Sequence, residues 1–110
     1  MAAPDEAAFE AVVEAMAGEP RVTQGKSFAS PSLMVGKKVF AMLFKGELVV
    51  KLPRARVDAI AASGEGRAFD PGMGRVMKEW VALGIEQASQ WKALAAEAMA
   101  FVEGLAAKGR

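Results

Sequence analysis

Residues 33–53 constrain the fold more than any other stretch, because two apolar runs flank one short break. The runs cover residues 39–44 and 47–52 and are rich in valine, leucine and phenylalanine, with Lys45-Gly46 between them. Two such runs separated by two residues predict an antiparallel β-hairpin. Lysine is a weaker turn signal than asparagine, because the first turn residue must adopt a positive φ.

The predicted hairpin has two faces, because successive side chains in a strand point to opposite sides of the sheet. With Lys45-Gly46 as the turn, one face is wholly apolar and should lie under the helices: Val39, Ala41, Leu43, Leu48, Val50 and Leu52. The other face carries a second apolar set, our candidate interface: Phe40, Met42, Phe44 and Val49. Two explanations of this second set stay open. A loop or the C-terminal helix covers it, or it binds a second copy of the chain or another protein.

Three helices are predicted around the hairpin, from periodic apolar positions and from proline and glycine near their ends. They cover residues 4–17, 53–63 and 89–107. On the first helix, glutamates repeat at every fourth position opposite the apolar stripe: Glu6, Glu10 and Glu14. That acidic row is either a partner-binding strip or an ordinary solvated helix face.

Short strands complete the predicted sheet. Residues 22–28 and 33–35 have strand character, and Ser30-Pro31-Ser32 between them predicts a turn. Residues 76–83 fit a strand or a helix, and Trp80 with Val81 favours the strand. We therefore expect an α+β fold, a two-layer α/β sandwich with helices packed on one face of an antiparallel meander sheet. Residues 1–110 are expected to form a single domain.

The composition removes several classes of chemistry. The chain contains no histidine, cysteine or tyrosine, which supply many of the general bases, thiolates and phenolic acids of active sites. The carboxylates outside the first helix do not have a spacing typical of acid–base catalysis or of metal binding. We therefore expect no enzyme activity, no catalytic residues, no metal and no cofactor.

Charge and hydropathy set the expected location and partners. The formal net charge is only +1, so any surface that attracts nucleic acid must be local. No apolar run approaches the ~20 residues that a membrane span needs. The acidic, alanine-rich start lacks the basic segment of a signal peptide. We expect a cytoplasmic protein with no membrane partner.

Basic residues concentrate in the middle of the chain. They form a candidate nucleic-acid-binding set: Lys37, Lys38, Lys51, Arg54, Arg56 and Lys78. An exposed Phe40 or Phe44 beside them would stack on bases. The alternative is that these are turn and strand-edge residues, which protect a sheet from edge-to-edge pairing. The glycines at residues 64–74 fit turns better than a phosphate loop, because a predicted strand follows them where a phosphate loop opens a helix.

The order of these motifs resembles that of a known family. The segments are residues 36–43 (Gly-Lys-Lys-Val-Phe-Ala-Met-Leu), 47–53 (Glu-Leu-Val-Val-Lys-Leu-Pro), 64–69 (Gly-Glu-Gly-Arg-Ala-Phe) and 77–81 (Met-Lys-Glu-Trp-Val). This ordered set resembles the TfoX N-terminal domain family and the related MmcQ/YjbR-like family. The resemblance implies a small two-layer α/β fold, a regulatory role and DNA binding among its relatives, with no catalytic motif to transfer. The chain departs from the family at residues 26–30, where relatives usually carry a Met-Phe-Gly-like segment.

Two functions follow as expectations. The preferred one is a small non-enzymatic binding or regulatory domain that acts in transcription regulation. It would do so through a protein partner, a second copy of the chain or weak nucleic-acid binding. The alternative is a small-molecule-binding domain with a pocket between the sheet and the 64–75 loop.

Overall fold

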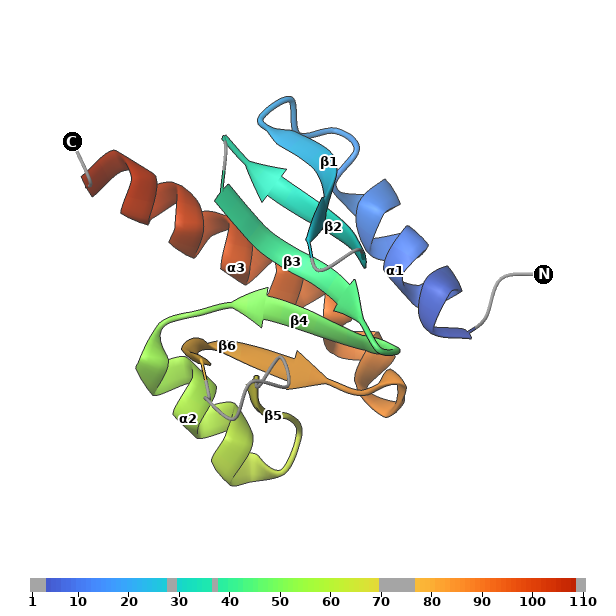
Figure 1. The fold of residues 1–110 in the computed structure, drawn as a ribbon, viewed down its shortest axis with the longest axis vertical. Coiled ribbons are helices and arrows are strands. Elements are labelled where there is room, and N and C mark those ends of the chain that lie inside the picture. Colours follow the sequence, from blue (N-terminus) through green and yellow to red (C-terminus); the bar gives the residue numbers. More distant parts are fainter. Residues whose placement is uncertain (1–3, 28–29, 37, 70–76, 109–110) are drawn as a thin grey trace.

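The computed structural model describes residues 4–27, 30–36, 38–69 and 77–108. The helices are α1 (Pro4–Ala15), α2 (Arg54–Ser63) and α3 (Ala88–Lys108), and a 3-10 turn, η1 (Ile85–Gln87), leads into α3. The strands are β1 (Val22–Ser27), β2 (Ser30–Val35), β3 (Lys38–Phe44), β4 (Glu47–Lys51), β5 (Arg67–Phe69) and β6 (Met77–Leu83). Figure 1 shows the arrangement of these elements.

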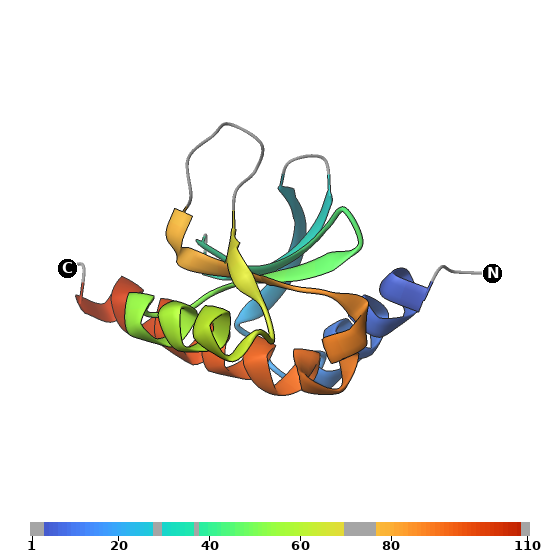
Figure 2. The same cartoon turned by 90° about the horizontal axis from the view of Figure 1, so that it is seen from below.

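The strands form one sheet in the order β1-β2-β3-β4-β6-β5, and every neighbouring pair is antiparallel. The three helices lie together on one side of the sheet (Figure 2). We call the other side the open face. The β1–β2 hairpin and β5 both bend away from the helix layer, so the open face is concave (Figure 2). The predicted α+β sandwich with helices on one face is confirmed.

The β3–β4 hairpin has the predicted register, with Ala41 opposite Val50 and Leu43 opposite Leu48. Both turn residues have positive φ angles, 51° at Lys45 and 81° at Gly46. Positive φ at both central positions is the mark of a type I′ turn, whose twist matches that of the flanking strands. The turn therefore forms despite the cost of holding a lysine in the left-handed region.

A bulge in β3 overturns part of the predicted face assignment. Leu33 lies opposite Ala41 but Met34 lies opposite Val39, so Phe40 is an extra residue without an opposite partner in β2. Such a residue breaks the strict alternation of side chains. Phe40 therefore joins Ala41 in the core under the helices, where it is 0% exposed. Our placement of Phe40 on the second face was wrong, and Val39, beside Met34, faces the open side instead of the helices.

The main core lies between the sheet and the helices. Residues from all three helices pack there against β2, β3, β4 and β6, including Val12, Val57 and Trp91. The Trp91 ring is fully buried, and its Nε1 donates a hydrogen bond to the carbonyl oxygen of Gly84 at 3.2 Å. A partner for the indole N–H is what a buried tryptophan needs.

Two local predictions need correction. Ser30-Pro31-Ser32 is not a turn, because these residues belong to β2 and lie opposite Ser27, Lys26 and Gly25 of β1. Pairing of β2 with β3 begins only at Ser32, so Pro31 has a partner strand on one side, as an edge proline does. Residues predicted as loop also contain the short strand β5. Residues 77–83 form the favoured strand, between β4 and β5.

Candidate functional site

Most side chains of the candidate interface are buried. Met42 and Val49 are only 2% and 0% exposed, and they form a second, smaller core with Phe69 and Ala82. Phe44 is half-buried beside them, with its ring edge-on to Phe69 at a centroid distance of 5.4 Å. Because Phe40 points into the main core, Phe44 alone of the predicted set retains accessible apolar surface.

Two lysines stand beside aromatic rings on the open face. Lys51 Nζ lies 5.8 Å from the centre of the Trp80 ring, and Lys45 Nζ lies 5.3 Å from that of Phe44. Each arrangement is a cation–π contact, worth about 0.5–1 kcal/mol at an exposed site. These pairs place positive charge and half-buried aromatic surface together on one side of the sheet.

The structure does not bring the predicted nucleic-acid-binding residues onto one face. Lys51 faces the open side of the sheet, whereas Arg54 and Arg56 lie on α2 in the helix layer (Figure 2). Lys38 is exposed at the start of β3. Lys37 and the side chain of Lys78 lie outside the described part of the structure.

Every arginine side chain that the structure describes is paired with a carboxylate. On α2, Arg54 Nε lies 3.9 Å from Asp58, and Arg56 Nε donates a hydrogen bond to Glu97 at 2.9 Å. Arg67 pairs with Glu47. Arg21 pairs with both Glu19 and Glu103. The hydrogen bonds to Glu47 and to Glu19 raise the pKa values of Arg67 and Arg21 respectively. Such surface pairs contribute little to stability. They do place a negative charge beside each guanidinium, which reduces the field that would attract phosphates.

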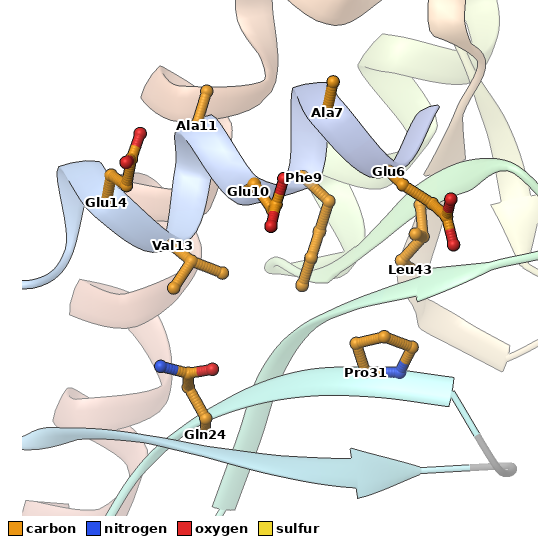
Figure 3. Close-up of a pocket in the computed structure, with 10 residues that line it drawn as sticks. All are labelled: Glu6, Ala7, Phe9, Glu10, Ala11, Val13, Glu14, Gln24, Pro31 and Leu43. Atoms are coloured by element: carbon orange, nitrogen blue, oxygen red, sulfur yellow. The ribbon is translucent and has the colours of Figure 1, made fainter. Parts of the chain in front are cut away.

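A groove lies between α1 and the β1–β2 hairpin (Figure 3). Its volume is about 580 Å³, within the range of pockets that hold ligands. Phe9 and Val13 point into it from α1, and Gln24 points into it from β1 (Figure 3). The remaining lining residues come from the same helix and from β2 and β3: Glu6, Ala7, Glu10, Ala11, Glu14, Pro31 and Leu43. We call this space the α1 groove.

The α1 groove continues towards the C-terminal end of α1. A second hollow of about 290 Å³ shares Val13, Glu14 and Gln24 with the first and adds more apolar lining: Met16, Ala17, Val22 and Leu33. The lining therefore combines an apolar floor with the acidic row Glu6, Glu10 and Glu14 along one rim.

The curvature of the sheet explains why this groove exists. α1 contacts α3 most extensively, and it also contacts η1 and β3, a strand near the middle of the sheet. The β1–β2 hairpin bends away from the helix layer (Figure 2). Since α1 stays with the other helices while the hairpin rises, a gap opens between them. The acidic row was visible in the sequence, but the strands that complete the groove were not, because their position depends on tertiary packing.

Metal-binding clusters and membrane-spanning helices are both absent from the described residues. No group of three or more His, Cys, Asp or Glu side chains there is placed to hold a metal ion. None of the helices described is both long and apolar enough to cross a membrane. Comparison of the chain with protein-family models, with curated proteins and with solved structures found no match.

Proposed function

We propose that this chain is a small non-enzymatic binding domain, and that it holds a segment of a protein partner in the α1 groove. The groove itself is the observation that supports this proposal best. It runs beside most of α1, has an apolar floor and is rimmed by charge, as sites for short protein segments commonly are. The resemblance to the TfoX N-terminal domain family favours a regulatory role, in transcription, for such binding.

The absence of histidine, cysteine and tyrosine from the sequence supports the non-enzymatic part of the proposal. The α1 groove is rimmed by carboxylates of one helix at intervals of one turn. The catalytic carboxylate pairs of glycosidases, by comparison, flank the bond that they break. The arrangement in the α1 groove is therefore better suited to attracting a cation than to breaking a bond.

A second candidate function is weak, salt-sensitive binding of single-stranded nucleic acid on the open face. The pairs Lys51–Trp80 and Lys45–Phe44 favour it, because bases stack on aromatic rings beside positive charge. The paired arginines weigh against tight binding. A small-molecule pocket beside the 64–75 loop would involve residues 70–75, which lie outside the described part of the chain.

Two neighbouring residues of β1 provide a matched test of the α1 groove. Gln24 pairs with the core residue Leu33 and lines the groove, whereas Thr23 pairs with Met34 and faces the open side. Both are exposed. Gln24→Trp should fill the groove, and Thr23→Trp adds the same ring to the opposite face of the same strand.

The experiment is selection of a random displayed-peptide library on the immobilised full chain. We expect enriched peptides that bind the wild-type chain and the Thr23→Trp variant but lose at least tenfold in affinity for Gln24→Trp. Failure to enrich any peptide, or enrichment of peptides that bind all three chains equally, would overturn the proposal. Circular dichroism of both variants checks that the fold is retained.

A further inference from the structure

We infer that the segment held in the α1 groove is an extended polybasic strand, with lysine or arginine at every second position, that adds to the free edge of β1. This inference rests on the proposed function and specifies its partner. Three features of the groove support it: the charge of its rim, the apolar character of its floor and the unpaired edge of the neighbouring strand.

The rim carries a regular row of negative charge. Glu6, Glu10 and Glu14 stand at successive turns of α1, so their Cα atoms are spaced by about 6 Å along the helix axis. Alternate side chains of an extended strand are spaced by about 6.6 Å. A strand with a basic residue at every second position therefore presents positive charges at nearly the same interval as the glutamates.

The apolar floor of the α1 groove can bind the methylene groups of lysine and arginine side chains. Phe9, Val13 and Leu43 give the groove an apolar lining. Lysine and arginine bury their methylene stems on apolar surface while their charged ends stay at the rim. A basic side chain thus satisfies both parts of the groove, which a purely apolar or an acidic side chain does not.

The edge of the sheet offers the backbone contacts. β1 is the terminal strand of the described sheet, and Thr23 and Gln24 within it are exposed. An extended segment that pairs with a free edge gains main-chain hydrogen bonds, and its alternate side chains select the sequence. Val22 and Gln24 both line the groove, so every second side chain of an added strand would enter it beside them.

Two labelled hexapeptides of the same composition test the spacing. In one, arginine and threonine alternate; in the other, the three arginines are contiguous. In fluorescence anisotropy titrations of the full chain at low salt, we expect the alternating peptide to bind several-fold more tightly. Equal affinity for the two peptides would overturn the inference.

Two further measurements test the charge and the strand pairing. Glu10→Gln should weaken binding of the alternating peptide by about two- to fivefold, as removal of an exposed ion pair does. Asp58→Asn, the same charge change on α2, should leave it unchanged. Methylation of one alternate set of peptide backbone nitrogens should abolish binding, and methylation of the other set should not. Insensitivity to Glu10→Gln or to both methylations would overturn the inference.

The library selection distinguishes this inference from the proposed function. If Gln24→Trp blocks the selected peptides but they are neutral or acidic, the groove is a protein-binding site and the polybasic partner is wrong. If labelled single-stranded DNA, titrated without peptide, binds the chain more tightly than the alternating peptide does and loses affinity for Gln24→Trp, the inference is also wrong, because the acidic rim should repel phosphates.

Discussion

Alanine substitution at two adjacent positions of β3 tests the bulge that separates the two faces of the sheet. Phe40 is fully buried in the main core, whereas Val39 is half-buried and lies on the open face. Phe40→Ala should lower the free energy of unfolding by about 3–5 kcal/mol, the usual loss for a buried phenylalanine. Val39→Ala should cost about 1 kcal/mol, because only part of a valine side chain is removed from a packed environment.

A strand without the bulge predicts a different result. Strict alternation would place Val39 beside Ala41 in the core, and its truncation would then cost about 2–3 kcal/mol. Urea unfolding followed by fluorescence measures both changes, since the buried Trp91 reports the loss of the core. A loss above 2 kcal/mol for Val39→Ala would refute the bulged register. If Phe40→Ala does not fold, Phe40→Leu should still show a loss of about 1–2 kcal/mol.

Two glycine substitutions should change stability in opposite directions. In Gly66→Ala the new Cβ would lie 2.7 Å from the carbonyl oxygen of Ala82, so we expect a loss of about 1–3 kcal/mol because the backbone of β6 must shift. A thermal melt should show the midpoint falling by about 4 °C or more, and an unchanged midpoint would contradict the close approach of the two segments. In Gly104→Ala the added methyl meets nothing within 4 Å in the last turns of α3, so we expect a gain of about 0.5–1 kcal/mol from helix propensity. A lower melting midpoint for this variant would show that the helix is not formed at residue 104.

Much of the fold could be predicted from local patterns. The β3–β4 register follows from the two-residue break between the two apolar runs. The turn occurs at Lys45-Gly46, as predicted. The helices follow from apolar positions at intervals of three and four residues. In each case the signal lies within a few neighbouring residues, so no knowledge of distant contacts was needed.

The bulge could not be predicted in the same way. Val39, Phe40 and Ala41 are all apolar, so moving the alternation by one residue leaves a pattern that looks equally suitable for burial. The strand β5 has only three residues and follows a glycine-containing loop, and its pairing with β6 decides its conformation. Both features depend on neighbouring strands and not on the local sequence.

Less of the candidate site than of the fold could be predicted from the sequence. The acidic row on α1 was recognised, but its opposite wall comes from Gln24 and Pro31, which have no distinctive pattern. The apolar set expected at an interface was divided by the bulge, and Met42 and Val49 were buried with Phe69. The apolar set that the sequence predicted to be accessible is therefore mostly buried. The α1 groove lies on the other side of the sheet, the side of the helices.

Backbone amide chemical shifts of the full chain, titrated with the alternating arginine–threonine peptide, test the central claim most directly. We predict shifts confined to α1 and β1, including the amides of Phe9, Val13 and Gln24. The amide resonances of Val49 and Ala82, whose side chains face the open side of the sheet, should not shift. Shifts centred on β4 and β6, with α1 and β1 unchanged, would contradict the assignment of binding to the α1 groove.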